Sequence, residues 1–287
     1  MGIFSFARKW EECKKDCGSV GGGGGKINRW SDCGCETCIS WMKEGRDKKL
    51  YVAVREPSRV INDDCGGDAS ENVIFLHGFL SSSSFWTETV FPNLSESVKH
   101  NYRLFAVDLL GFGRSPKPRD CLYTLRDHLE MIEKSVINSF QLKSFHLVAH
   151  SMGCIIATAL AVKYSKQVKS ITLVAPGMGK DSEAANLEKG SRFQDHGPDK
   201  AHPSFSLAYH AQCDMVKICV IQGDCDQVVP VECSYNIKKK VPDAEVNMIS
   251  NADHTSVVIG REKDFTQNLE HIWASFATEF CLEDDAR

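Results

Sequence analysis

Residues 145–157, FHLVAHSMGCIIA, place a serine and a glycine between two apolar runs. The first run is short enough for a buried strand, and Cys154–Tyr164 continues the second with the length of a buried helix. A strand, a tight turn and a helix are the setting of a nucleophile elbow, which needs small residues on both sides of its serine. Here Ala149 and Gly153 flank Ser151 at the required positions. The other interpretation is an ordinary helix N-cap, where serine is also favoured.

Short apolar runs elsewhere predict further strands. They are Leu50–Val54, Val73–Leu76, Leu104–Val107, Ile171–Val174, Ile218–Ile221 and Ala244–Ile249. Helical patterns lie between them, most clearly at Leu122–Phe140 and Phe265–Phe276. Strands that are apolar on both faces and alternate with helices predict an α/β fold, with a mostly parallel sheet flanked by helices.

Candidate partners for Ser151 follow two later strands. A serine hydroxyl is a weak nucleophile, so it needs an imidazole to accept its proton and a carboxylate to orient that imidazole. The loop after Ile218–Ile221 contains Asp224 and Asp226, and the loop after the last predicted strand contains His254. Because the carboxyl ends of parallel strands meet at one edge of a sheet, these loops can bring an acid and a histidine to the serine.

Two backbone N–H groups complete the expected chemistry. A tetrahedral intermediate carries an oxyanion that must be stabilised by donors already in place. Met152, directly after the serine, supplies one N–H group, and Phe79, which follows His77 and Gly78 at the end of a predicted strand, supplies the other. These placements at strand ends favour serine catalysis over the N-cap interpretation, and this chemistry requires no metal ion or organic cofactor.

Composition excludes several other classes of function. The 287 residues carry a net charge of −4, so no nucleic-acid partner is expected. No run of about 18 apolar residues is present, and the charged start of the chain has no signal-peptide pattern. We therefore expect an intracellular, cytoplasmic protein, in which the 13 cysteines are mostly free thiols.

The N-terminal residues contain two further patterns, each with two interpretations. Cys35 and Cys38 form a Cys-x-x-Cys motif, but no second pair completes a zinc site, so thiols or a local disulfide are favoured over metal. Cys13 and Cys17 lie beside lysines, and their acylation would give weak peripheral membrane contact. A frayed tail is the favoured interpretation, and the start nearly matches a myristoylation signal except for Phe6.

Several longer motifs extend the pattern. They are WSDCGCETC at 30–38, FLHGFLSSS at 75–83, VDLLGFGRSP at 107–116, HSMGC at 150–154, PVECSY at 230–235 and DHTSVVIGR at 253–261. With these motifs the chain resembles the α/β-hydrolase superfamily and, within it, the plant BODYGUARD group of lipid-ester hydrolases. The first and fifth motifs are the more specific to that group.

The resemblance implies a role for each candidate residue. It implies that Ser151 is the nucleophile, His254 the general base and Asp226, in preference to Asp224, the acid of a Ser-His-Asp triad. It also implies that Asp108 has a structural role, and we expect His77 and His150 to shape the site.

The domain organisation follows from the pattern along the chain, which has five consecutive glycines at 21–25 and becomes regular from Asn72. We expect an N-terminal extension with a Gly-rich linker, partly disordered, over residues 1–70, and an α/β-hydrolase domain over residues 71–287. Residues 177–214 stand where the group has a longer helical cap, which predicts a reduced lid and a more open acyl-binding surface.

The resemblance further implies hydrolysis of a carboxylic ester, either a lysophospholipid or another lipid ester linked to plant cuticle formation. Two alternatives remain at this point. One is acyl transfer by the same residues, and the other is a non-catalytic ligand-binding protein or receptor on a hydrolase scaffold. The resemblance also leaves a membrane or cell-wall location open beside the cytoplasmic one. The oligomeric state has no signal in the sequence.

Overall fold

The computed structural model describes residues 49–58, 71–118, 121–177 and 216–284. The predictions for the Gly-rich linker, the Cys-x-x-Cys motif and the reduced lid fall outside these residues, apart from Gly177. None of the helices in the described part of the chain is both long enough and apolar enough to cross a membrane.

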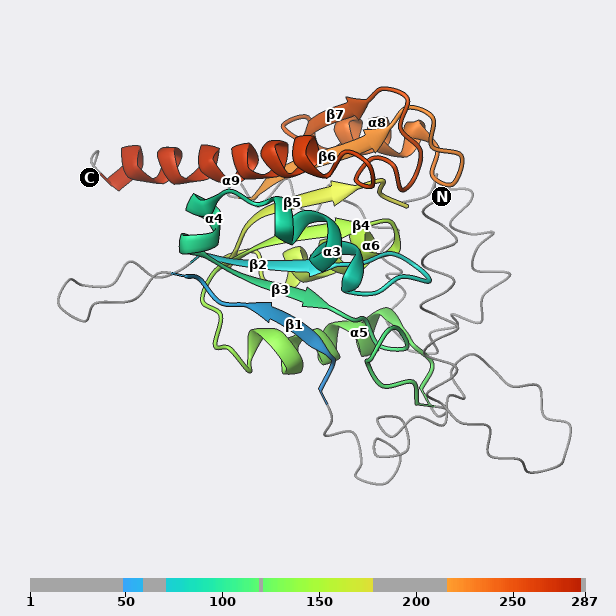
Figure 1. Ribbon diagram of the computed structural model, residues 1–287, viewed down its shortest axis with the longest axis vertical. Helices are drawn as coiled ribbons and strands as arrows, with labels where there is room; N and C mark the ends of the chain where they lie inside the picture. Colours follow the sequence, from blue (N-terminus) through green and yellow to red (C-terminus); the bar gives the residue numbers. More distant parts are fainter. Residues whose placement is uncertain (1–48, 59–70, 119–120, 178–215, 285–287) are drawn as a thin grey trace, which may run out of the picture.

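A single seven-stranded sheet forms the centre of the described residues, with the strand order β1-β3-β2-β4-β5-β6-β7 (Figure 1). The strands are β1 (Val52–Arg55), β2 (Glu71–Leu76), β3 (Tyr102–Val107), β4 (Phe145–His150), β5 (Val168–Val174), β6 (Lys217–Gly223) and β7 (Glu245–Ile249). All neighbouring pairs are parallel except β1 and β3, which are antiparallel. The predicted α/β fold is therefore confirmed, and β1, upstream of residue 71, is an edge strand of the same sheet.

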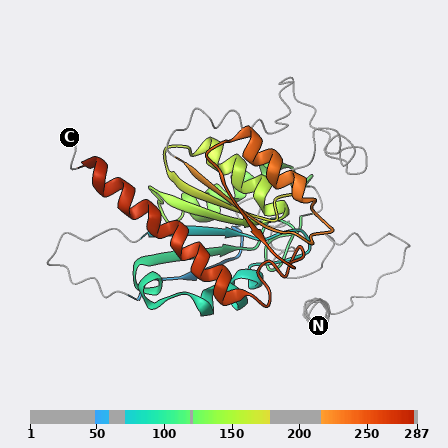
Figure 2. The same cartoon turned by 90° about the horizontal axis from the view of Figure 1, so that it is seen from above.

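Helices cover both faces of the sheet (Figure 2). They are α3 (Ser84–Asn93), α4 (Glu96–Asn101), α5 (Leu125–Ile132), the π-helical turn η1 (Glu133–Ile137), α6 (Met152–Lys163), α8 (Val231–Lys240) and α9 (Glu262–Asp284). In β2, Ile74 and Leu76 pack into the cluster beneath α5 and α6, whereas Val73 and Phe75 pack into the cluster beneath α3 and α9. Alternate side chains of a strand point to opposite faces, so a continuous apolar run is what two covered faces require.

Three helices were not predicted from the sequence. α3 begins at the last of four consecutive serines and contains Pro92 near its end, and both features are typical of a loop. α4 has only six residues, and α8 ends in three consecutive lysines. Packing decides these segments: α3 buries Trp86 and Phe91 against the sheet and α9.

Candidate active site

Ser151 lies at the junction between β4 and α6, at the carboxyl edge of the sheet. Its backbone has φ 53° and ψ −121°, a conformation that is costly for a residue with a side chain. A Cβ atom on Gly153 would lie 2.6 Å from the carbonyl oxygen of His77 and 2.9 Å from that of Leu76. The turn is therefore as sharp as a nucleophile elbow requires, and position 153 accepts only glycine.

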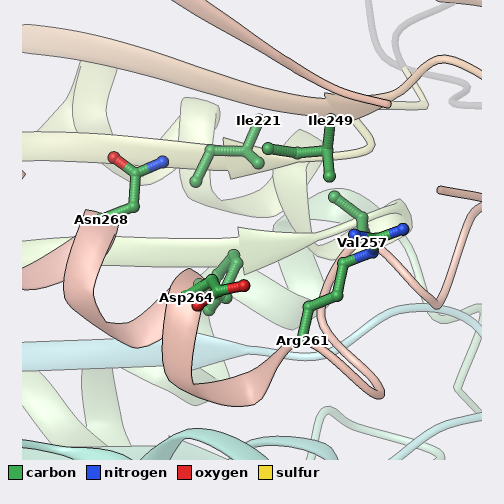
Figure 3. Close-up of a pocket in the computed structure, with 7 residues that line it drawn as sticks. Ile221, Ile249, Val257, Arg261, Asp264 and Asn268 are labelled. Atoms are coloured by element: carbon green, nitrogen blue, oxygen red, sulfur yellow. The ribbon is translucent and has the colours of Figure 1, made fainter. Parts of the chain in front are cut away.

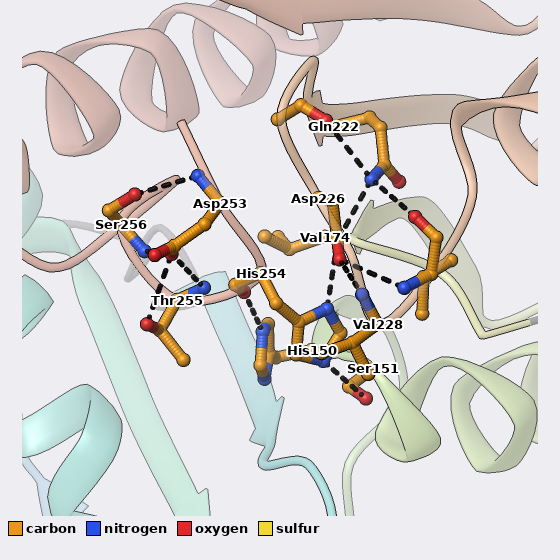
Figure 4. A network of polar contacts seen from close by, with 12 residues as sticks. His150, Ser151, Val174, Gln222, Asp226, Val228, Asp253, His254, Thr255 and Ser256 are labelled. Carbon is orange, nitrogen blue, oxygen red and sulfur yellow. Dashed lines mark hydrogen bonds and ion pairs between the residues drawn. The ribbon is translucent and has the colours of Figure 1, made fainter. Parts of the chain in front are cut away.

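Two hydrogen bonds join the side chains of Ser151, His254 and Asp226 at this edge (Figure 4). Ser151 Oγ is 2.9 Å from His254 Nε2, and His254 Nδ1 is 2.8 Å from Asp226 Oδ2. Because an ionised carboxylate only accepts hydrogen bonds, the ring proton of neutral His254 lies on Nδ1. Nε2 therefore presents its lone pair to the serine hydroxyl, as a general base must.

The two aspartates of the loop after β6 have different surroundings. Asp226 is 9% exposed, and its Oδ1 accepts hydrogen bonds from the backbone N–H groups of Val228 and Val229, at 2.8 and 2.9 Å. Asp224 is exposed, and its backbone N–H donates to the carbonyl of Ile249 at 3.1 Å. Of the two, Asp226 faces the imidazole, while the backbone of Asp224 joins the loop to β7.

The two residues expected to supply oxyanion donors lie close to the serine, Met152 as its chain neighbour and Phe79 next to Gly78. A Cβ atom on Gly78 would be 3.0 Å from Ser151 Cβ, so the turn that contains Phe79 lies directly against the nucleophile. Met152 is the first residue of α6, where a backbone N–H has no acceptor within the helix and lies at the positive end of the helix dipole. This arrangement can accommodate a negative charge next to Ser151.

Asp108 connects the start of α3 to the loop after β3. It is buried, its Oδ1 accepts a hydrogen bond from the N–H of Ser83 at 2.5 Å, and its Oδ2 accepts one from the N–H of Arg114 at 2.7 Å. A Cβ atom on Gly113, which has φ 51°, would collide with this carboxylate at 2.1 Å. Asp108 contacts no atom of Ser151 or His254 within hydrogen-bonding distance, so its place in the fold is structural.

His77 and His150 are buried beside the three hydrogen-bonded residues Ser151, His254 and Asp226. His77 Nδ1 donates to the carbonyl of Gly78 at 2.7 Å and its Nε2 accepts from the N–H of Leu109 at 3.0 Å, while burial lowers its pKa. His150 Nε2 donates to the carbonyl oxygen of His254 at 2.8 Å. Burial lowers the pKa of His150 to about 4, so both rings are neutral at pH 7 and act by holding the backbone in place.

Asp253 holds the loop that carries the imidazole. Its Oδ1 accepts hydrogen bonds from the N–H groups of Thr255 and Ser256, at 2.9 and 2.7 Å, and these bonds lower its pKa to about 2 (Figure 4). Ser256 Oγ accepts from the N–H of Asp253 at 2.8 Å. The sequence analysis missed this turn, although the run Asp-His-Thr-Ser contains the residue types that form such side-chain turns.

A cavity of about 160 Å³ lies on the α9 side of the same loop. Ile221 and Ile249 lie on one side of it and Arg261, Asp264 and Asn268 on another (Figure 3). Ser151, His254 and Asp226 do not line this cavity. It is therefore separate from the position at which an ester would meet the serine.

Comparison with known proteins points to one family. A family model described as alpha/beta hydrolase fold matches residues 71–201. The chain is 40% identical over 316 residues to "Probable lysophospholipase BODYGUARD 4" of Arabidopsis thaliana, covering 87% of this chain and 74% of that protein. It is 39% identical over 321 residues to "Probable lysophospholipase BODYGUARD 2" of the same plant, covering 85% and 66%. The second alignment is longer than this whole chain, so that relative contains segments with no counterpart here.

More distant similarities agree on the fold. A "1-acylglycerol-3-phosphate O-acyltransferase" of Rattus norvegicus is 27% identical over 194 residues, covering 61% of this chain and 52% of that protein. A solved carboxylesterase of Nitrososphaera gargenis has a TM-score of 0.58 at 19% identity, covering 80% of this chain and 96% of the other. A monoacylglycerol lipase of Paleococcus ferrophilus has a TM-score of 0.58 at 14% identity, covering 80% and 100%.

Proposed function

The chain belongs to the α/β-hydrolase family as a relative of the BODYGUARD proteins, and on that premise we propose that it is a serine hydrolase of carboxylic esters, with a lipid or lysophospholipid ester as substrate. The observation that carries this proposal is the 2.9 Å contact between Ser151 Oγ and a His254 ring whose other nitrogen is bonded to Asp226.

The proposed reaction has two half-reactions. Ser151 Oγ attacks the acyl carbon as His254 Nε2 takes the hydroxyl proton, and Asp226 stabilises the resulting imidazolium. The N–H groups of Met152 and Phe79 bind the oxyanion. The imidazolium then gives its proton to the leaving alcohol, which leaves an acyl-serine. Water that loses a proton to His254 attacks this ester, and the acid departs as the serine recovers its proton.

The substrate class rests on the relatives and on the length of the segment between β5 and β6. Both BODYGUARD relatives described above carry the name probable lysophospholipase, and we extend an ester of that kind to this chain. A link to plant cuticle formation is part of the proposal on the sequence resemblance alone. Residues 177–214 are a short segment for a lid, and a short lid buries little of a long acyl chain. We therefore expect short or exposed acyl groups to be preferred over long ones.

Acyl transfer is the second candidate, because the rat relative is named as an acyltransferase. The acyl-serine would be the same, and a hydroxyl of an acceptor lipid would replace water in the second half-reaction. Incubation of an acyl donor with excess glycerol-based acceptor separates the two: free acid as the main product supports hydrolysis, and an acylated acceptor supports transfer.

A fluorophosphonate probe tests the nucleophile. We expect the wild-type protein to be labelled at one site, and Ser151→Ala to be unlabelled with an unchanged circular dichroism spectrum. Ser135→Ala is the matched control, because Ser135 is a buried serine that accepts from the N–H of Leu50 and has no bond to His254. Absence of labelling in a folded wild-type protein would support the alternative of a non-catalytic ligand-binding protein.

A series of p-nitrophenyl esters of increasing chain length tests the open acyl-binding surface. The expected order is butyrate above octanoate above palmitate in kcat/KM. A strong preference for palmitate would contradict it.

A further inference from the structure

Behind the candidate catalytic acid lies a buried amide that the proposed reaction does not use. Gln222 is the penultimate residue of β6 and is fully buried. Its Nε2 is 3.0 Å from Asp226 Oδ2, the same oxygen that accepts the hydrogen bond from His254 Nδ1 (Figure 4). On the basis of the proposed function, we propose that Gln222 is a positioning residue, which fixes the carboxylate of Asp226 and limits how strongly that carboxylate attracts the proton of His254.

The surroundings allow Gln222 one orientation. On one side its amide faces only acceptors: Asp226 Oδ2 at 3.0 Å, and the carbonyls of Val229 and Gly223 at 3.2 and 3.3 Å. The NH₂ group must lie on this side, because an amide oxygen there would meet three other oxygens. On the other side, Gln222 Oε1 therefore accepts from the hydroxyl of Ser234 at 3.1 Å. A flipped amide would lose its hydrogen bonds to Asp226 and Val229.

Gln222 completes the set of donors around the acid. Oδ1 of Asp226 accepts from Val228 and Val229, and Oδ2 accepts from His254 and Gln222. A carboxylate offers about four acceptor positions, so these four donors saturate it and prevent its rotation. Without Gln222, Oδ2 would have His254 as its one remaining donor, and a buried carboxylate oxygen would be under-solvated.

This under-solvation has a predictable effect on His254. A carboxylate with fewer donors attracts the imidazolium more strongly, so His254 would remain protonated to higher pH. The base form of His254 is the active form, and the acid limb of the pH profile would then move to higher pH. Loss of the fixed geometry would also lower the rate at every pH.

The position of the acid thereby depends on α8. Ser234 is a fully buried residue of α8, and its hydroxyl donates to Gln222 Oε1, which supports the orientation that the three acceptors around the NH₂ group impose. A chain of hydrogen bonds thus leads from α8 to the candidate nucleophile, through Ser234, Gln222, Asp226, His254 and Ser151. Removal of the Ser234 hydroxyl should therefore weaken the effect of Gln222 without removing its donor.

Three variants and one control test this inference. Gln222→Met keeps the volume and loses the donor, and Ser234→Ala loses the orienting hydroxyl. We expect kcat/KM for p-nitrophenyl butyrate to fall about 10- to 100-fold in Gln222→Met, since a hydrogen bond to a charged group is lost, and about threefold in Ser234→Ala. The acid limb should move to higher pH in both, further in Gln222→Met. Gln222→Glu, which adds a second carboxyl beside Asp226, should show a new ionisation in the profile.

The control is Ser135→Ala, which breaks a buried hydrogen bond to Leu50 near β1, at the side of the sheet away from β6. It should lower the melting temperature to a similar extent and leave the pH profile unchanged. Gln222→Met could lower the melting temperature while kcat/KM stays within about twofold of the wild-type value and the acid limb within about 0.2 pH units. In that case Gln222 is merely structural and the inference is wrong. If Gln222→Met does not fold, an unshifted limb in Ser234→Ala has the same meaning.

A readout without turnover separates this inference from the proposed function. The titration of His254 in the resting protein can be followed by NMR of the histidine ring signals. An upward shift in Gln222→Met supports the inference even if no ester is cleaved, and an unchanged titration overturns it even if Ser151 is labelled by the fluorophosphonate.

Discussion

Among the described residues, a serine, a histidine and a carboxylate come together at both edges of the sheet. The carboxyl-edge group consists of Ser151, His254 and Asp226. The amino-edge group consists of Ser170, His146 and Glu71, near the amino ends of β5, β4 and β2. In the amino-edge group, His146 Nδ1 is 2.7 Å from Ser170 Oγ, and His146 Nε2 is 3.7 Å from Glu71 Oε2. A hydroxyl, an imidazole and a carboxylate therefore occur close together twice, once at the proposed catalytic site and once at the opposite ends of the strands.

The carboxylates differ first. Asp226 lies at 2.8 Å from its histidine, whereas Glu71 forms an ion pair with Lys169 at 2.5 Å and lies beyond hydrogen-bonding distance from His146. Burial, with a smaller contribution from Lys169, lowers the pKa of His146 to about 3. A histidine with so low a pKa is a poor acceptor for a serine proton.

Backbone and access differ as well. Ser170 lies within β5 as the register partner of His146, and both side chains are almost completely buried. Ser151 lies where the chain leaves the sheet, with a positive φ angle and the first N–H groups of α6 beside it. On the proposed function, the reactivity of Ser151 would depend on the turn out of the sheet and on the carboxylate bonded to the imidazole, as well as on the presence of the three groups.

The largest expected effect comes from exchanging the carboxylates for amides. Asp226→Asn should lower kcat for p-nitrophenyl butyrate about 1,000- to 10,000-fold, because an amide can stabilise the wrong tautomer of His254. Glu71→Gln should change kcat less than about twofold, since Glu71 contacts no residue of the carboxyl-edge group. A similar loss in both variants would remove the distinction between the two groups.

Acidification should act on the amino-edge group through stability. In the unfolded chain His146 binds a proton below its ordinary pKa of 6.5, whereas in the folded chain it does so only near 3. Its contribution to the free energy of unfolding is therefore complete above pH 6.5 and is lost as the pH falls toward 3, by at most about 1.4 kcal/mol per pH unit.

Urea denaturation between pH 7 and 4 measures this slope. His146→Gln, which can keep a hydrogen bond to Ser170, should show a shallower loss of stability than the wild-type protein. Parallel curves for the two proteins would show that His146 is not the titrating group. Glu71, Lys169 and Tyr102 surround His146, so their variants are the next to compare if the slope changes.

The smallest effect is expected for the second serine. Ser170→Ala should reduce the free energy of unfolding by about 1 kcal/mol, the net value of one buried hydrogen bond. Fluorophosphonate labelling at Ser151 should be unchanged in rate and extent. Slower labelling would mean that the two edges of the sheet are coupled, contrary to the comparison.

Much of the fold could be predicted because its signals are local. Runs of four to six apolar residues predicted each strand, and Ala149, Ser151 and Gly153 predicted the elbow from small side chains at fixed spacing. α3 and α8 were not predicted, because the serine run at the start of α3 and the lysine run at the end of α8 favour a loop. In the structure, apolar residues of both helices are buried against the sheet. The antiparallel pairing of β1 also had no local signal.

Some residues of the candidate site could likewise be predicted from the sequence, and others could not. Strand ends and motif spacing pointed to Ser151 and His254, while the residues alone left Asp224 and Asp226 as alternatives until the resemblance favoured the second. Nothing in a single glutamine at the end of an apolar strand indicated that Gln222 would contact an aspartate. The sequence likewise contained no sign that Ser170 and His146 would meet.

The alternation of strands and helices, the elbow and the residue types available for chemistry could be read from the amino-acid sequence, because they depend on neighbours within a few positions. The tertiary structure alone decided which aspartate faces His254, which amide holds that aspartate, and which of two serines meets a usable base. Those contacts join residues up to 103 positions apart, and they depend on the register and packing of the whole sheet.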